Sequence, residues 1–226
     1  MTPWSLLDTA TIPGNGTALQ LFRRGEEFSI KVVGGGELMN TRMHGSEDAL
    51  AELSCQHVTD KADARVLIGG LGMGFTLAAA LQHLPASAEV VVAELIPAVV
   101  QWNQGPLGEH AGYPLRDPRV HVHEGDVAKL IKAGRRDYDV IMLDVDNGPE
   151  GLTRKGNNWL YSIDGLTAAY TALRSNGILA VWSAGPERVF TERLRKLGFQ
   201  VKERRVRAHP SQKKAKHVIW LAQRVD

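Results

Sequence analysis

The sequence has few of the features that would assign it to a class at once. Its 226 residues include one cysteine, Cys55, so neither a disulfide framework nor a thiolate metal cluster is expected. No apolar run reaches the ~18 residues that a membrane-spanning helix needs. The first residues lack a basic stretch followed by an apolar core, so no signal peptide is predicted. We therefore expect a cytoplasmic protein without a membrane partner and without a bound metal.

A strong excess of one charge is also missing. The formal net charge is +2, and 43% of the residues are hydrophobic, which is ample for a core. Residues 186–226 nevertheless hold 12 Lys and Arg against 4 Asp and Glu. Such a segment could contact RNA phosphates, but a solvated edge hairpin protected by its charges is the favoured interpretation. The basic residues concerned are Arg204, Arg205, Arg207, Lys213, Lys214 and Lys216.

The most informative stretch is a glycine cluster that follows a short apolar run. A strand-like segment at 65–68 leads into the cluster, and a helix-like segment begins at Phe75. A strand, a glycine turn and a helix start bring backbone amides close to a nucleotide-like ligand. The spacing is G-x-G-x-G and no Gly-Lys-Ser/Thr follows, so an adenosyl ligand fits better than a pyrophosphate. The alternative is a tight turn without a ligand. The glycines are Gly69, Gly70, Gly72 and Gly74.

The chain divides into a small N-terminal part and a larger part. Residues 1–60 are expected to form a small β appendage plus a helix, with antiparallel strands at 18–22, 28–33 and 37–39. The helix is predicted from Glu47 to about His57, capped by Ser46. Residues 61–226 are expected to form a Rossmann-like domain that binds an S-adenosyl ligand.

The larger part alternates between strand-like and helix-like segments. Apolar runs without alternation indicate parallel strands covered on both faces. We therefore predict an α/β fold: a seven-stranded, mostly parallel sheet of the class I S-adenosylmethionine methyltransferase type with a small N-terminal antiparallel β appendage. The expected strands are 65–68, 89–94, 120–123, 139–143 and 177–183, then an antiparallel pair at 199–207 and 217–223. The expected helices are 75–84, 97–104, 127–133 and 163–174.

Acidic residues follow three of the expected strands. Ligands of open α/β sheets bind at the carboxyl ends of strands, so these acids are candidate contacts. Glu94 could accept both ribose hydroxyls, and Asp126 could accept from an adenine amino group or merely cap the next helix. Asp144 and Asp146 point the same way if their segment is extended. Each acid alone could instead be a surface residue.

Together these motifs resemble the spermidine synthase (polyamine aminopropyltransferase) family from about residue 18 to the end. The resemblance implies S-adenosylmethionine or its decarboxylated form as donor, with methylthioadenosine or S-adenosylhomocysteine as product. It also implies a homodimer and a cofactor site that includes Gly70, Gly72, Gly74, Glu94 and Asp126. The motifs that carry it are Gly70–Phe75, Glu94, Asp117–Arg119, Glu124–Asp126 and Tyr138–Asp144.

The sequence departs from that family at the substrate pocket. The family's glycine turn reads Gly-Gly-Gly-Asp-Gly-Gly, and its Asp, expected to hold the donor's amine, is Met73 here. The family's Tyr-Gln-Glu before the first helix reads Gly45-Ser46-Glu47, which keeps Glu47 as a substrate contact but removes the tyrosine. Its Asp-Ser-Ser-Asp-Pro loop reads Asp144-Val-Asp-Asn-Gly-Pro149, with the second acid out of register by one. The resemblance therefore supports the adenosyl ligand more strongly than a polyamine acceptor.

By the same resemblance Asp144 is the candidate base, with Asp146 beside it to raise its pKa. The alternative is that both acids only bind a cation or cap a loop. Residues 148–162 could form a lid that excludes water, and Trp159 and Tyr161 at its end are candidate substrate contacts. The alternative is a solvated loop with these aromatics packed beneath it.

Three residues outside these motifs are weaker candidates for a role in the site. His121 and His123 could begin a metal site, but solvated histidines on an edge strand are expected. Trp182 is expected in the core rather than against a ligand.

Two classes of function remain open. The first is a transferase that uses an S-adenosyl-type sulfonium donor on a small, cationic acceptor and moves either an aminopropyl or a methyl group. The second is a non-catalytic scaffold that binds an adenosyl nucleoside. An RNA methyltransferase that uses the basic segment is a third, less favoured alternative.

Overall fold

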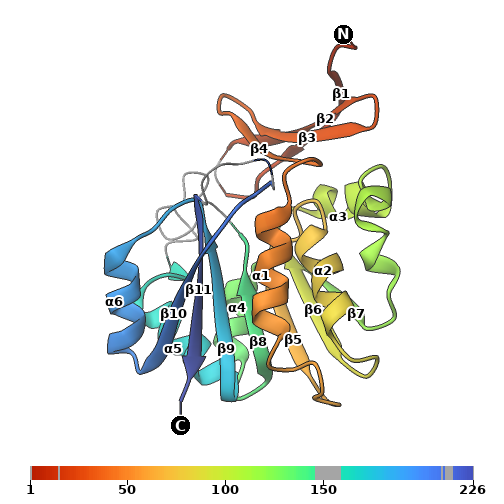
Figure 1. The fold of residues 1–226 in the computed structure, drawn as a ribbon. Helices are drawn as coiled ribbons and strands as arrows, with labels where there is room; N and C mark the ends of the chain where they lie inside the picture. The colour runs from red at the N-terminus through yellow and green to blue at the C-terminus, as the bar shows by residue number, and fades with distance from the viewer. Residues whose placement is uncertain (1, 15, 146–158, 210, 212–215, 226) are drawn as a thin grey trace.

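The computed structural model describes residues 2–14, 16–145, 159–209, 211 and 216–225, and shows two sheets, one above the other (Figure 1). The smaller sheet has the strand order β1-β2-β3-β4, and the larger one has the order β10-β11-β9-β8-β5-β6-β7. No helix among the described residues combines the length and the apolar character needed to span a membrane.

The small sheet is an antiparallel meander at the N-terminus. Three of its strands match the prediction, but the first was missed, because its residues show no period-2 alternation and are mostly exposed. The indole Nε1 of Trp102 donates to Asp8 Oδ2 at 2.7 Å and so ties this strand to a helix of the larger domain. The strands are β1 (Ser5–Thr11), β2 (Ala18–Arg24), β3 (Glu27–Val32) and β4 (Glu37–Asn40).

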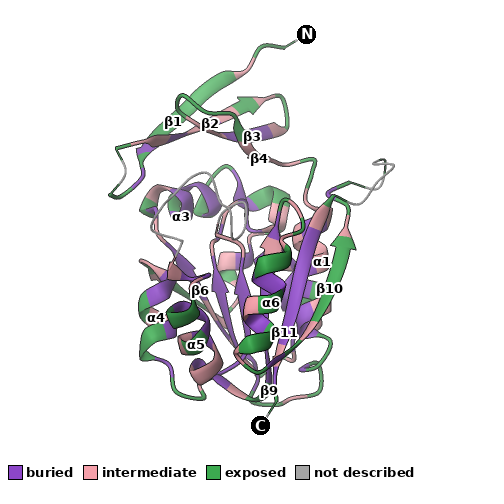
Figure 2. Ribbon diagram, turned by 90° about the vertical axis from the view of Figure 1, so that its left-hand side faces the viewer, coloured by how far each residue is buried: buried purple, intermediate pink, exposed green. Residues whose placement is uncertain are grey.

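The large sheet confirms the predicted fold class. Five neighbouring strands run parallel, and β11 pairs antiparallel with both β9 and β10. The central strands are mostly apolar and almost entirely buried, which is why they show no alternation (Figure 2). The strands are β5 (Arg65–Gly69), β6 (Glu89–Glu94), β7 (Val120–Glu124), β8 (Tyr138–Leu143), β9 (Leu173–Ser183), β10 (Phe199–Val206) and β11 (His217–Arg224).

Helices cover both faces of the large sheet. One face packs against α1, α2 and α3, and the other against α4, α5 and α6 (Figure 1). The helices are α1 (Gly45–Cys55), α2 (Phe75–His83), α3 (Pro97–Gln104), α4 (Val127–Ala133), α5 (Ile163–Ala172) and α6 (Arg188–Lys196), with short 3-10 helices at Gly108–Ala111 and Pro114–Arg116.

Two helical predictions need correction. Ser46 does not cap α1, because the helix begins at Gly45 and the cap position is His44. The hydroxyl of Ser46 instead donates to Glu47 Oε2 at 2.6 Å. The sequence interpretation also missed α6, a highly charged segment in which only Phe190, Thr191 and Leu194 are buried.

Candidate active site

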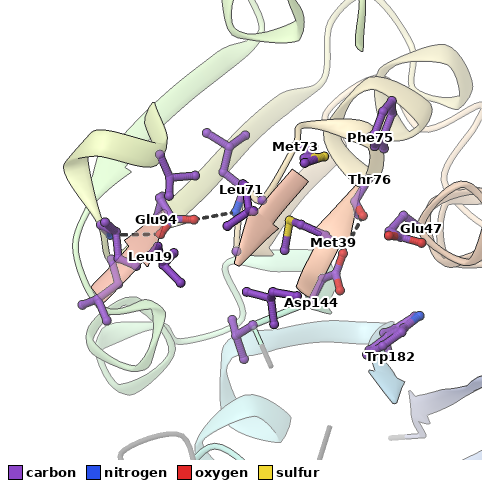
Figure 3. A pocket seen from close by; sticks show the side chains of 18 of the residues that line it. Leu19, Met39, Glu47, Leu71, Met73, Phe75, Thr76, Glu94, Asp144 and Trp182 are labelled. Atoms are coloured by element: carbon purple, nitrogen blue, oxygen red, sulfur yellow. Dashed lines mark hydrogen bonds between the residues drawn. The ribbon is translucent and has the colours of Figure 1, made fainter. Parts of the chain in front are cut away.

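A cavity of about 390 Å³ lies at the carboxyl ends of the parallel strands, beneath the N-terminal sheet. Its walls come from the glycine loop after β5, the ends of β6 and β8, the start of α1, and residues of β2, β3 and β4. Figure 3 shows Glu94 at one end of this cavity and Glu47 at the other, with Met39 between them and Asp144 nearer Glu47. This is the edge at which open α/β sheets bind ligands.

The glycine loop is shaped by its lack of side chains. Gly70 has φ +90°, and a Cβ there would overlap the carbonyl oxygen of Asp144. Gly74 has φ +84° and occupies the cap position of α2, where a Cβ would lie 2.8 Å from Asn103 Oδ1. Both positions therefore need glycine, and the loop backbone forms a wall of the cavity. Of the predicted loop contacts, Gly70 and Gly72 line the cavity, whereas Gly74 starts the helix behind them.

Glu94 ends β6 and fixes the loops on either side of the cavity. Its Oε2 accepts from the backbone N–H of Leu71 and its Oε1 from that of Ile96, each at 2.9 Å (Figure 3). Burial raises the pKa of this carboxyl, while the backbone hydrogen bonds act in the opposite direction. The backbone N–H groups of Gly72 and Leu95 also interact with this carboxylate. Ligand hydroxyls would therefore share its roughly four acceptor positions with backbone donors.

Asp126 caps a helix and also lines the cavity. Its Oδ1 accepts from Ala128 N at 2.9 Å and caps α4. The residue also lines the cavity, next to Gly125 and Val127. Capping therefore does not remove Asp126 from the site.

Two further acids lie at the far end of the cavity. Asp144 follows β8, and its Oδ2 accepts from Thr76 Oγ1 at 2.7 Å. Glu47 stands on the first turn of α1, with its carboxyl toward Thr76 and Asp144 (Figure 3). Burial raises the pKa of Asp144. Burial, followed by the charge of Asp144, raises the pKa of Glu47 to about 7. Asp146 lies outside the described residues.

The cavity is acidic. Among the described residues that line it there is no Lys or Arg. Its one lining histidine, His217, has a pKa lowered by burial and by the charge of Lys216, so it adds little positive charge near neutral pH. A concave site lined by one sign of charge concentrates ligands of the opposite sign. The acids that line the cavity are Glu37, Glu47, Glu94, Asp126 and Asp144.

An apolar wall lies between the ends of the cavity. Met73 follows Gly72 on the loop and is 4% exposed. Met39 reaches over the loop from β4, with its sulfur 3.1 Å from the position of a Cβ on Gly72. These thioethers would contact the middle of a ligand that extends from Glu94 to Glu47.

The aromatic residues Trp159 and Tyr161 were expected to contact substrate, but the structure does not bring them to the cavity. Tyr161 is 3% exposed and its ring packs edge-on against Phe190 at 5.9 Å. Trp159 is half-buried, with Lys132 Nζ 4.1 Å from its ring centre. Both side chains thus contact other described parts of the chain, while residues 146–158, most of the segment considered as a lid, lie outside the described residues.

Other residues outside the motifs are also placed by the fold. His121 and His123 lie on β7, the edge strand, and the described residues contain no group of three or more His, Cys, Asp or Glu that could hold a metal ion. Trp182 was expected in the core; it packs against the core cluster and also lines the cavity, as do Thr76 and Met39. The signal for Trp182 was available, because it stands near the carboxyl end of β9.

Comparisons with known proteins agree with this geometry. The Spermine/spermidine synthase domain matches residues 28–194. Polyamine aminopropyltransferases of Thermoanaerobacter sp. and Thermoanaerobacter pseudethanolicus are each 30% identical over 145 residues, which cover 64% of this chain and 50% of each relative. The chain thus matches about half the length of these curated relatives.

Solved structures show the same fold at low identity. Spermidine synthase from Thermotoga maritima superposes with a TM-score of 0.74 at 17% identity, over 98% of this chain and 74% of that one. A probable spermidine synthase from Corynebacterium glutamicum gives 0.64 at 12% identity, over 97% of this chain and 79% of that one.

Proposed function

Because the chain belongs to the spermine/spermidine synthase family, we propose that it transfers the aminopropyl group of decarboxylated S-adenosylmethionine to a small amine. The observation that carries this proposal is the charge of the cavity, which has five lining carboxyl groups and no Lys or Arg among the described lining residues. Both the donor and a protonated amine acceptor are cations, and such a site favours them.

The same charge argues against methyl transfer from S-adenosylmethionine. That donor carries a carboxylate on its methionine tail, and the decarboxylated donor does not. No described cation in the cavity could pair with the carboxylate, and an unpaired buried charge binds poorly. Nucleic-acid phosphates are disfavoured for the same reason.

The nucleoside end of the donor is assigned to the Glu94 end of the cavity. Gly70 and Gly72 offer close approach to backbone, Glu94 offers acceptors for the ribose hydroxyls, and Asp126 offers one for the adenine amino group. Met73 stands where the family usually has an aspartate, so this loop position offers the donor's ammonium group no counter-charge. The carboxyls nearer the other end, Glu47 and Asp144, are the available counter-charges.

Asp144 is assigned as the base. The acceptor must lose a proton before its nitrogen can attack the carbon next to the donor's sulfonium. The C–S bond then breaks and its electron pair stays on sulfur as a thioether. A carboxylate with a raised pKa is a better proton acceptor than an ordinary aspartate, and the hydroxyl of Thr76 orients Asp144 Oδ2.

The test is product analysis by mass spectrometry after incubation with either donor and a panel of primary amines. We expect an aminopropylated amine and methylthioadenosine from the decarboxylated donor. A methylated product formed from S-adenosylmethionine alone would replace this function with methyl transfer. The absence of any product would favour the non-catalytic nucleoside-binding scaffold.

Substitution Asp144→Asn separates catalysis from binding. General-base catalysis contributes typically about 10²–10⁴-fold, so we expect a rate loss in that range with methylthioadenosine binding changed little. Asp164→Asn, on the exposed first turn of α5, is the matched control and should keep full activity. Unchanged turnover in Asp144→Asn would remove the assigned base.

A further inference from the structure

Glu47 and Asp144 form a pair of carboxyl groups brought together from distant parts of the chain. Glu47 comes from the start of α1 and Asp144 from the loop after β8, and both line the same end of the cavity (Figure 3). Each is held by a hydroxyl donor: Ser46 Oγ lies 2.6 Å from Glu47, and Thr76 Oγ1 lies 2.7 Å from Asp144. One hydroxyl donor apiece does not neutralise two carboxylates.

When two neighbouring carboxyl groups share a buried site, ionising the second costs more free energy than ionising the first, because the two charges repel. Burial raises the pKa of Asp144, and burial together with the charge of Asp144 raises the pKa of Glu47 to about 7. Near neutral pH the empty pair therefore retains part of a proton. A bound cation would stabilise both ionised forms and lower the pair's affinity for that proton.

An aromatic ring completes this end of the cavity. Trp182 lines it from the end of β9, on the same side as Glu47 and away from Glu94 (Figure 3). Tryptophan is the most favourable aromatic partner for an ammonium group. Two acids and an indole provide the chemistry that recognises an organic ammonium ion rather than an inorganic cation.

The other titratable groups near Glu47 do not supply its counter-charge. On its own helix, Asp48 pairs with His44 at 2.8 Å, and the charge of Asp48 raises the pKa of Glu47 further. Beside Trp182, whose ring centre lies 5.0 Å from that of His217, burial and Lys216 lower the pKa of His217. Glu37 of β4 also lines the cavity and adds negative charge.

On the premise of the proposed function, we infer that Glu47 determines specificity for an organic ammonium ion, which binds in exchange for a proton. The empty Glu47–Asp144 pair keeps a proton, and an organic ammonium ion that binds beside Trp182 displaces it to solvent. In this exchange, the protonated pair and one ammonium ion give the ion-paired complex and one free proton. The acceptor amine therefore binds in its charged form, and the pair regains proton-accepting capacity only when a cation is present.

The experiment is isothermal titration calorimetry on the whole chain saturated with methylthioadenosine, with choline as the probe. Choline has a permanent charge and no ammonium proton, so any proton released comes from the protein. Titrations at pH 6.5 in phosphate and in MES, which differ in protonation enthalpy and carry no net positive charge, give the number of protons released. We expect more than about half a proton for the unmodified chain, and affinity that rises about tenfold from pH 6 to pH 8.

Matched controls make the outcome decisive. Glu47→Gln should release almost no proton and lose the pH dependence, whereas Glu52→Gln, on the exposed side of α1, should behave as the unmodified chain. The uncharged isostere 3,3-dimethylbutan-1-ol should bind at least about tenfold more weakly than choline. The inference is overturned if choline fails to bind or binds without proton release. It is also overturned if choline releases as many protons from Glu47→Gln as from the unmodified chain. Amine transfer by a chain that shows no such release would leave the proposed function intact.

Discussion

At the scale of single residues, the site depends on carboxyl groups that do more than one task. Glu94 joins the loops after β5 and β6 through the amides of Leu71 and Ile96, and it also faces the cavity. Asp126 caps α4 and faces the same space. The residues proposed to contact a nucleoside are therefore held in place by the fold before a ligand arrives, which lowers the ordering cost of binding.

Glu94→Gln should weaken nucleoside binding. The amide nitrogen would replace an acceptor with a donor, and hydrogen bonds to charged groups contribute about 1.5–3 kcal/mol. We expect methylthioadenosine to bind roughly 10- to 150-fold more weakly by calorimetry. Glu89→Gln, at the opposite end of the same strand, is the control and should keep its affinity. Equal affinity in both variants would remove Glu94 from the nucleoside site.

Glu47 should make the empty protein less stable as pH rises. Its folded pKa of about 7 exceeds its usual value of 4.5, so the unfolded chain ionises first and stability falls between these pH values. The slope is at most about 1.4 kcal/mol per pH unit for one group. Urea unfolding from pH 5 to 8 should show this fall, and Glu47→Gln should reduce it. An unchanged pH slope in that variant would show that Glu47 ionises normally.

At the scale of elements, the glycine loop is the part of the site that the sequence described best. The sequence predicts a strand, a tight glycine turn and a helix in direct succession. The structure has this arrangement at β5, the glycine loop and α2. The acids at strand ends were predicted as site residues because ligands of open α/β sheets bind at the carboxyl ends of the strands. The position of Tyr161 could not be predicted in this way, because its burial depends on Phe190 of α6. That helix was not predicted, because its sequence is highly charged.

Gly70→Ala should damage this loop. The residue has φ +90°, and an added Cβ would overlap the Asp144 carbonyl oxygen. Strain in a positive-φ position costs about 1–3 kcal/mol before the overlap is counted. We expect a lower melting temperature and no detectable nucleoside binding. Gly36→Ala, where a Cβ meets nothing within 4 Å, should change neither, and a stable, binding-competent Gly70→Ala would contradict the loop geometry.

At the scale of the whole molecule, the cavity exists because two sheets meet. The large sheet supplies Glu94 and Asp144, and the small sheet covers them with Leu19, Ile30 and Met39. The large sheet and most of the small one were predictable from local patterns. The position of Met39 over Gly72 and the grouping of Glu47 with Asp144 and Trp182 were not, because these contacts depend on how distant segments pack.

The central claim is that this acidic cavity selects a donor that has lost its carboxylate. The most direct measurement is calorimetric comparison of S-adenosylmethionine and decarboxylated S-adenosylmethionine on the unmodified chain under identical buffer and salt. We expect the decarboxylated donor to bind at least about tenfold more tightly, a difference of about 1.4 kcal/mol. Equal or tighter binding of S-adenosylmethionine would contradict the account.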